Sequence, residues 1–145
     1  MHKTEQTLSV IREVFAAFDA HDPDRFRQLL ADNAVLNVGG TDQSLSGSAA
    51  IVEAVGVTLK SIPDLRVTVT NAFAQGPNGV AEVIREGTNS EPIPLPDGTV
   101  APATGQPVRL PECAVFKIQN GKIARMSVYT DRLDTYQQLG LLPAE

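Results

Sequence analysis

Three charged side chains stand in or beside apolar β-type segments and could perform acid–base chemistry. Arg85 lies within one such segment, Glu112 follows a proline early in a second, and Asp131 comes directly after a third. A carboxylate in apolar surroundings holds its proton more tightly and can act as a general acid or base, while an arginine can stabilise an oxyanion. A buried arginine needs a carboxylate partner, and Glu112 could pair with Arg85 or act as the base itself.

Asp131 and Arg85 also have interpretations without chemistry. Asp131 precedes a closing helix, where its side chain would cap free backbone amides. Arg85 falls on the more apolar side of its segment, which predicts the face of a cavity, but it could equally point outward into solvent. These alternatives remain open from the sequence.

Two amides could add polar groups to a pocket. Asn37, near the end of the first predicted strand, and Asn89, at the end of a later one, can each donate and accept a hydrogen bond. Asn37 could instead form a turn before Gly39-Gly40. Met126, Val128 and Tyr129 in the last predicted strand are further candidates for substrate binding.

Composition bounds the class of protein. The chain has 145 residues, which predicts one domain over 1–145. Its net charge of -5, with scattered basic residues, argues against a nucleic-acid partner. A single cysteine and two histidines give no support for a metal site. The single cysteine also fits a reducing compartment, because it cannot form a disulfide within the chain. We find no apolar span of membrane length and expect a cytoplasmic protein.

The elements that must position these residues follow from periodicity. Apolar residues at helical spacing predict a first helix from Thr4 to Ala20, and Asp22-Pro23 predicts the start of a second that runs to about Leu30. A loop is expected from Gly39 to Gly47, and a third helix from Ser48 to Lys60. The expected strands are Ala34 to Val38, Leu65 to Ala74, Val80 to Asn89, Val108 to Gln119 and Lys122 to Thr130.

A tight turn at Asn120-Gly121 predicts that the last two strands form a hairpin. If Gln119 pairs with Lys122, regular alternation puts Glu112 on the same face as Tyr129 and on the other face from Val128. A β-bulge near Pro111 would reverse this placement. One predicted face holds Cys113, Val115, Ala124, Met126, Val128 and Thr130. The other holds Ala114, Phe116, Ile118, Ile123, Arg125, Ser127 and Tyr129. Phe116, Ile118 and Ile123 on that second face predict a self-complementary patch and hence a homodimer.

The segment from Ser90 to Pro107 is rich in proline and glycine. Proline lacks an amide donor, so this segment should not join the sheet. Loops of this length are often lids or binding loops, although a passive connector is an equal alternative.

Helices followed by sequential strands predict an α+β fold with a curved antiparallel sheet wrapped around an N-terminal helical layer and an internal pocket. In this order the chain resembles the SnoaL-like polyketide cyclases, within the cone-shaped nuclear-transport-factor-two-like superfamily. The matching segments are Ile62-Pro63-Asp64-Leu65, Gly87-Thr88-Asn89, Pro102-Ala103-Thr104-Gly105, Val115-Phe116, Gly121-Lys122-Ile123, Tyr129-Thr130-Asp131 and Gln138-Leu139-Gly140-Leu141-Leu142-Pro143.

The resemblance implies an intramolecular aldol cyclisation, or related isomerase or lyase chemistry, on an apolar ring-containing substrate without a cofactor or metal. Relatives often carry an aromatic residue or histidine and then an aspartate in the last strand, at places that look like Met126 and Val128 here. Valine cannot move a proton, so another carboxylate would have to act. The place of Arg85 also resembles that of an arginine in limonene epoxide hydrolases, but Gly87 replaces the aspartate found there. The competing function is non-catalytic binding of a small apolar molecule.

Overall fold

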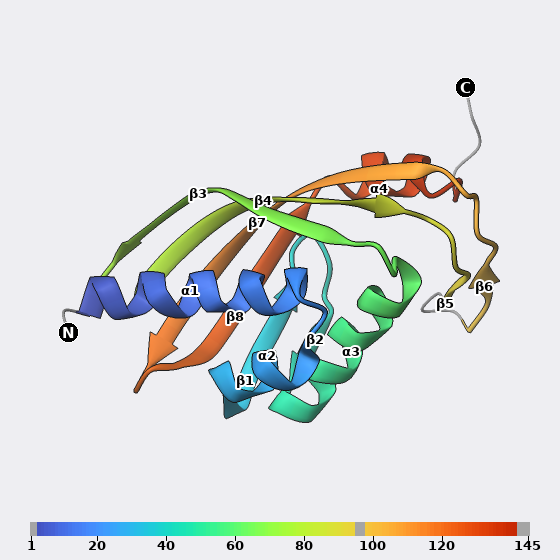
Figure 1. Cartoon of the computed structure of the whole chain (residues 1–145). Coiled ribbons are helices and arrows are strands. Elements are labelled where there is room, and N and C mark those ends of the chain that lie inside the picture. Colours follow the sequence, from blue (N-terminus) through green and yellow to red (C-terminus); the bar gives the residue numbers. More distant parts are fainter. Residues whose placement is uncertain (1–2, 95–97, 142–145) are drawn as a thin grey trace.

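The computed structural model describes residues 3–94 and 98–141 and shows an α+β fold with helices beside a large curved sheet (Figure 1). The helices are α1 (Lys3–Asp19), α2 (Pro23–Leu29), α3 (Ser48–Ser61) and α4 (Arg132–Gln138). The strands are β1 (Leu30–Val38), β2 (Ser44–Ser46), β3 (Arg66–Gln75), β4 (Asn78–Thr88), β5 (Ile93–Pro94), β6 (Val100–Ala101), β7 (Pro107–Gln119) and β8 (Lys122–Thr130). β1 begins at Leu30 rather than Ala34, and β2 lies within the expected loop.

The main sheet is mixed and open, in the order β2-β1-β8-β7-β4-β3. Its neighbours pair antiparallel except β1 and β8, which run parallel. The expectation of a purely antiparallel sheet is therefore wrong at this pair. Tight turns force β3 and β4, and β7 and β8, to run antiparallel, whereas β1 and β8 are far apart in the sequence and no turn fixes their relative direction.

A β-bulge in β8 decides which hairpin residues face inward. Gln119 pairs with Lys122 as expected, and Ile118 pairs with Ile123, but Lys117 then pairs with Arg125. Ala124 is the extra residue, and it moves the rest of β8 to the opposite face from that predicted by regular alternation. The inner face carries Glu112, Ala114, Phe116, Ile118, Ile123, Met126, Val128 and Thr130. The outer face carries Cys113, Val115, Lys117, Arg125, Ser127 and Tyr129.

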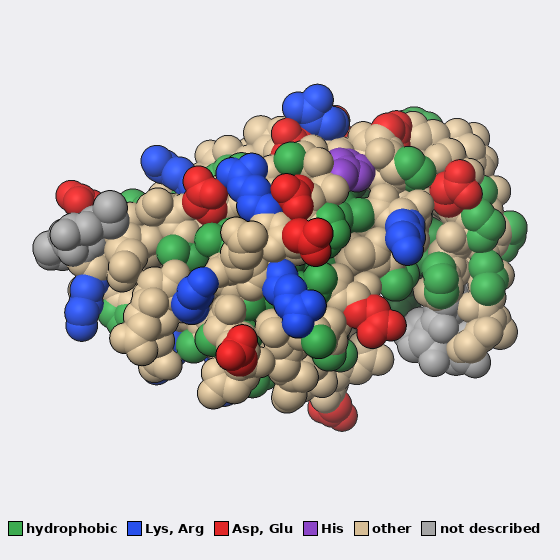
Figure 2. Space-filling view, turned by 60° about the horizontal axis from the view of Figure 1, so that its bottom comes forward, with side chains coloured by type: hydrophobic (Ala, Val, Ile, Leu, Met, Phe, Trp, Pro, Cys, Tyr) green, Lys and Arg blue, Asp and Glu red, His purple; other side chains and the backbone are tan. Residues whose placement is uncertain are grey.

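This register also corrects the predicted dimer patch. Phe116, Ile118 and Ile123 are 1%, 4% and 0% exposed, so they form part of the core and cannot contact a second chain. They pack beneath α1, which lies on the concave side of the sheet together with α2 and α3 (Figure 1). Figure 2 shows this helical side of the molecule, where positive and negative side chains are interspersed.

Helix α1 packs against β3, β4 and β7 through its apolar stripe. At Gly79 in β4 the approach is so close that a β-carbon would lie 2.4 Å from the Cδ1 atom of Ile11. At the end of α1, the Asp19 carboxylate accepts hydrogen bonds from the backbone amide of Val67 and the side chain of Arg66. α2 begins as expected, because Asp22 caps it and Pro23 is its first residue.

The proline-rich segment stays outside the main sheet except at Pro107, with which β7 begins, and among the described residues its strands β5 and β6 pair with each other. Residues 95–97 of it lie outside the described part of the chain. The base of the segment is closed by backbone hydrogen bonds between Asn89 and Gln106 and between Gly105 and Asn89. α4 then attaches to the start of β7, since the Gln138 side-chain amide bonds to the backbone N–H and C=O of Arg109.

Candidate active site

Two hollows lie between the helical layer and the inner face of the sheet. The deeper one has a volume of about 90 Å³ and is apolar apart from Thr58, Arg85 and Glu112. The outer one has a volume of about 290 Å³. Their walls share Leu36, Val55, Thr58, Arg85, Glu112 and Val128. The two hollows therefore adjoin one another, and the charged side chains lie where they meet.

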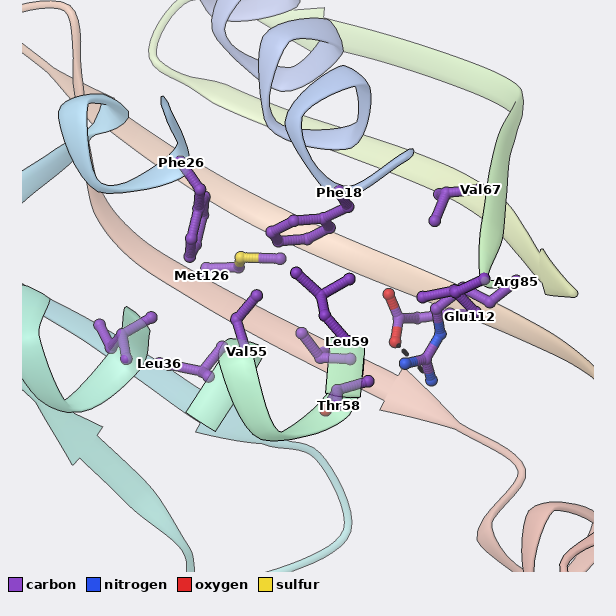
Figure 3. Close-up of a pocket in the computed structure, with 13 residues that line it drawn as sticks. Phe18, Phe26, Leu36, Val55, Thr58, Leu59, Val67, Arg85, Glu112 and Met126 are labelled. Carbon is purple, nitrogen blue, oxygen red and sulfur yellow. Dashed lines mark ion pairs between the residues drawn. The ribbon is translucent and has the colours of Figure 1, made fainter. Parts of the chain in front are cut away.

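Arg85 and Glu112 form an ion pair inside this site, with Nη2 of Arg85 3.1 Å from Oε1 of Glu112. Arg85 stands on β4 and Glu112 on β7, and strand alternation points both toward the helices. Their side chains are 19% and 8% exposed. Figure 3 shows the pair at one end of the pocket, with Phe18, Phe26 and Met126 gathered at the other.

The electrostatics favour a carboxyl group that can hold a proton. Burial raises the pKa of Glu112 above its ordinary value, and the nearby Arg85 charge only partly opposes this shift. The Nε atom of Arg85 is buried and has no hydrogen-bond partner within the described residues. Proton transfer at a carbon next to a carbonyl requires a carboxyl group with a raised pKa and a hydrogen-bond donor beside it, and Glu112 and Arg85 supply these two groups.

Of the residues suggested by the sequence, Met126 and Val128 line the cavity with Arg85 and Glu112. All four stand on the inner face of the sheet, and the β8 bulge is what brings Met126 and Val128 there. Cys113, which was expected to share their surroundings, lies on the opposite face because it alternates with Glu112 on β7.

Asn37 and Tyr129 do not reach the cavity. Asn37 pairs with Ser127 between β1 and β8, and its Nδ2 atom donates to the Ser127 hydroxyl at 3.3 Å. Tyr129 is 50% exposed on the same outer face. The expected placement of both residues in the pocket is wrong, since the bulge at Ala124 turns Ser127 and Tyr129 outward.

Asp131 and Asn89 have structural contacts elsewhere. The Asp131 carboxylate accepts a hydrogen bond from the backbone amide of Asp134 and caps α4, and it lines neither hollow. Asn89 is fully buried at the base of the proline-rich segment, where its Nδ2 atom donates to the Thr104 hydroxyl. The expectation that these two residues belong to the site is therefore not met, because neither contacts the cavity.

The helical half of the cavity wall is not among the site residues expected from the sequence. Phe18 of α1, Phe26 of α2 and Val55, Thr58 and Leu59 of α3 line it. The helical spacing that predicted these elements also marked their buried faces, so it could have suggested these side chains. Whether a given buried side chain lines a cavity or fills the core depends on how the helices pack on the sheet.

Within residues 3–94 and 98–141 we find no group of three or more His, Cys, Asp or Glu side chains placed to hold a metal ion. None of the helices in that part of the chain is both long and apolar enough to cross a membrane.

The family follows from a comparison with family models, in which the model of the SnoaL-like domain matches residues 11–126. The chain belongs to the SnoaL-like domain family. Its matched region contains Arg85 and Glu112 and ends at Met126, so the cavity and its ion pair lie largely inside the SnoaL-like part. No curated protein matches the chain.

Solved structures give the same fold for this SnoaL-like chain. A crystal structure described as a SnoaL-like polyketide cyclase from Jannaschia sp. CCS1 is 21% identical, with a TM-score of 0.84 over 97% of this chain and 96% of that one. IdmH from Streptomyces antibioticus, described as a polyketide cyclase, is 23% identical, with a TM-score of 0.76 over 93% and 99%. An LEH-like epoxide hydrolase from M. tuberculosis is 17% identical, with a TM-score of 0.73 over 94% and 90%. At these identities the likeness concerns the fold alone.

Proposed function

We propose that this SnoaL-like protein is an acid–base enzyme that moves a proton at a carbon next to a carbonyl group of a small apolar substrate. Glu112 would take and return the proton, and Arg85 would hold the oxygen on which negative charge develops. The observation that carries the proposal is the buried Arg85–Glu112 pair at the junction of the two hollows. An aldol cyclisation or an isomerisation would both begin with this step.

The chemistry of the step fits the groups present. Glu112 removes a proton from the α-carbon, and the electron pair of that C–H bond forms an enolate whose oxygen takes the charge. In an aldol cyclisation the enolate carbon then bonds to a second carbonyl of the same molecule, and the resulting alkoxide takes the proton back from Glu112. In an isomerisation Glu112 returns the proton to another carbon. Arg85 uses Nη2 for Glu112, and its side chain is 19% exposed, so the remaining N–H groups of the guanidinium can donate to the substrate oxygen.

The shape of the site limits the substrate. The inner hollow is small and apolar, and both hollows together are near the lower end of the range of about 300–1,000 Å³ for small-molecule pockets. A compact ring or short chain would enter the inner hollow, and its carbonyl oxygen would reach Arg85 at the junction.

Deuterium exchange at the α-carbon of small cyclic ketones and 1,3-diketones in heavy water, followed by proton NMR, tests the proposal without the natural substrate. We expect the protein to accelerate exchange over buffer, and Glu112→Gln to lower that rate by a factor of about 10² to 10⁴. Asp131→Asn is the matched carboxylate control, because Asp131 caps α4 outside the cavity and should leave the rate unchanged.

Exchange that remains at the wild-type rate in a folded Glu112→Gln variant would overturn the assignment of the base. Non-catalytic binding is the competing function. Val128 favours it, because valine cannot move a proton and stands where relatives often carry an aspartate that can. If the protein only binds its ligand, calorimetry should detect binding of the same ketones and diketones to the wild-type protein, while their deuterium exchange stays at the rate measured in buffer.

A further inference from the structure

The wall of the outer hollow contains hydrogen-bond donors from three different elements. They belong to Thr58 of α3, Arg85 of β4 and Thr130 of β8. Thr130 lies directly opposite Glu112 in the register of β7 and β8. Figure 3 shows Thr58 at the same end of the pocket as the ion pair. The oxygen atoms of a bound molecule would therefore meet donors from several sides of this hollow.

The Arg85 guanidinium is only partly used by Glu112. Its Nη2 atom lies 3.1 Å from Oε1 of Glu112, but its Nε atom has no partner among the described residues, so the two do not form a pair of parallel hydrogen bonds along this edge. A guanidinium has five N–H donors. Because the side chain is 19% exposed, its remaining N–H groups can donate to a second carboxylate while Nη2 stays beside Glu112.

The charge balance of the cavity decides what a second carboxylate does to Glu112. Among the described residues that line the two hollows, Arg85 and Glu112 are the charged ones. Two carboxylates beside one guanidinium leave a net negative charge in apolar surroundings, and a proton on one of them removes it. Burial already raises the pKa of Glu112. An anion in this cavity therefore favours the protonated form of Glu112.

The other titratable groups near Glu112 lie outside the two hollows. Cys113 follows Glu112 on β7 but points to the outer face, where it pairs with Glu82 of β4. Asp131 caps α4. The side chains that α1, α2, α3, β1, β3 and β8 contribute to the hollows are uncharged. Glu112 is therefore the group that can answer the charge of a bound anion by taking up a proton.

We propose that the cavity binds apolar carboxylates and that each bound anion brings one proton onto Glu112. The apolar part of the ligand lies in the inner hollow, and its carboxylate lies beside Arg85, Thr58 and Thr130. The ligand then replaces the negative charge of Glu112 next to the guanidinium. One consequence rests on the proposed function: a bound carboxylate should stop the exchange of ketone α-hydrogens, because a protonated Glu112 cannot act as a base.

Isothermal titration calorimetry with cyclohexanecarboxylate tests the proposal. Titrations at about pH 8 in two buffers of different ionisation enthalpy count the protons taken up, and we expect close to one per bound ligand. The dissociation constant should rise by up to about tenfold per pH unit above the pKa of Glu112. Cyclohexanecarboxamide is the neutral ligand of the same shape. At about pH 6 it should bind at least about tenfold more weakly, and it should take up no proton.

Three variants assign the proton and the charge. Glu112→Gln should bind cyclohexanecarboxylate without proton uptake and with a dissociation constant that does not change between about pH 6 and pH 8. Arg85→Gln should weaken carboxylate binding at least about 100-fold and change carboxamide binding by less than about threefold. Arg125→Gln is the matched control, because Arg125 is exposed on the outer face and this variant should bind the carboxylate as the wild type does.

Each variant is checked by circular dichroism to be folded. A wild-type protein that takes up no proton, that binds the carboxylate no more tightly than the carboxamide, or whose Glu112→Gln variant still takes up a proton would overturn the proposal. If Glu112→Gln does not fold, the proton count and the carboxamide comparison on the wild type still decide. These results are independent of the exchange assay, because binding and proton uptake are measured without any ketone.

Discussion

Arg85 and Glu112 meet diagonally across two neighbouring antiparallel strands. In the strand register Arg85 pairs with Leu110 and Glu112 with Val83. On the inner face, however, Nη2 of Arg85 lies 3.1 Å from Oε1 of Glu112. The pair is largely shielded from water, and Glu112 still has a raised pKa because its burial outweighs the attraction of Arg85. The proposed chemistry depends on this balance.

The raised pKa of Glu112 predicts how stability depends on pH. The folded protein binds the proton of Glu112 more tightly than the unfolded chain does, so this group makes folding less favourable as pH rises from the ordinary glutamate value, about 4.3, through the folded pKa. The stability of the wild type relative to Glu112→Gln should therefore fall over this window and become constant above it. Urea titrations of both proteins between pH 4 and pH 8 measure the difference, and a difference that increases with pH would contradict the prediction.

Asp19 predicts the opposite dependence. Hydrogen bonds from Arg66 and from the backbone amide of Val67 hold the pKa of Asp19 below its ordinary value. Its contribution to stability should be present above pH 4 and should be lost as pH falls through the folded pKa. Asp19→Ala should cost about 1 kcal/mol at pH 7, since the pair is partly exposed, and less at pH 3. Arg66→Ala should cost less because the Val67 bond remains. An equal cost at both pH values would contradict this.

Two glycines should respond to alanine with opposite signs. Gly79→Ala introduces a β-carbon against Ile11 and Thr7, pushes α1 from β4, and should lower the free energy of unfolding by about 1 to 3 kcal/mol. Gly56 lies in α3 with nothing within 4 Å of the position of its β-carbon. Gly56→Ala should raise the free energy of unfolding by up to about 1 kcal/mol. Chemical denaturation of the two variants beside the wild type measures both changes. A Gly79→Ala variant that is as stable as the wild type would contradict the close packing at Gly79.

Asn89 should hold the base of the proline-rich segment and contribute to the free energy of unfolding. Its amide is buried and donates to Thr104, so Asn89→Ala removes one hydrogen bond and leaves the Thr104 hydroxyl without this donor. We expect a loss of about 1 to 3 kcal/mol in the free energy of unfolding. Hydrogen exchange should become faster at the Gly105 amide, which bonds to the Asn89 carbonyl. Unchanged exchange at Gly105 would show that the side chain does not hold the base of this segment.

Much of the fold could be predicted because its signals are local. The spacing of apolar residues in α1 and α3, the cap at Asp22-Pro23 and the turn at Asn120-Gly121 each act over a few residues, and the structure contains all four features. The resemblance to the SnoaL-like family, read from short motifs in order, is confirmed by the match over residues 11–126. The sequence also named Arg85 and Glu112 as possible partners, because a buried arginine requires a carboxylate.

Tertiary structure alone decided which residues share a face. A single extra residue at Ala124 brings Met126 and Val128 to the cavity and turns Tyr129 to the surface, while the same change leaves Ile123 in the core. The side-chain period of a strand is two, so one inserted residue reverses every later position, and the apolar character of both hairpin faces hid that reversal. Composition and periodicity determined the elements and their order, and the local sequence also indicated the cap at Asp131, but the pairing between strands determined which residues line the pocket and which lie on the outer face.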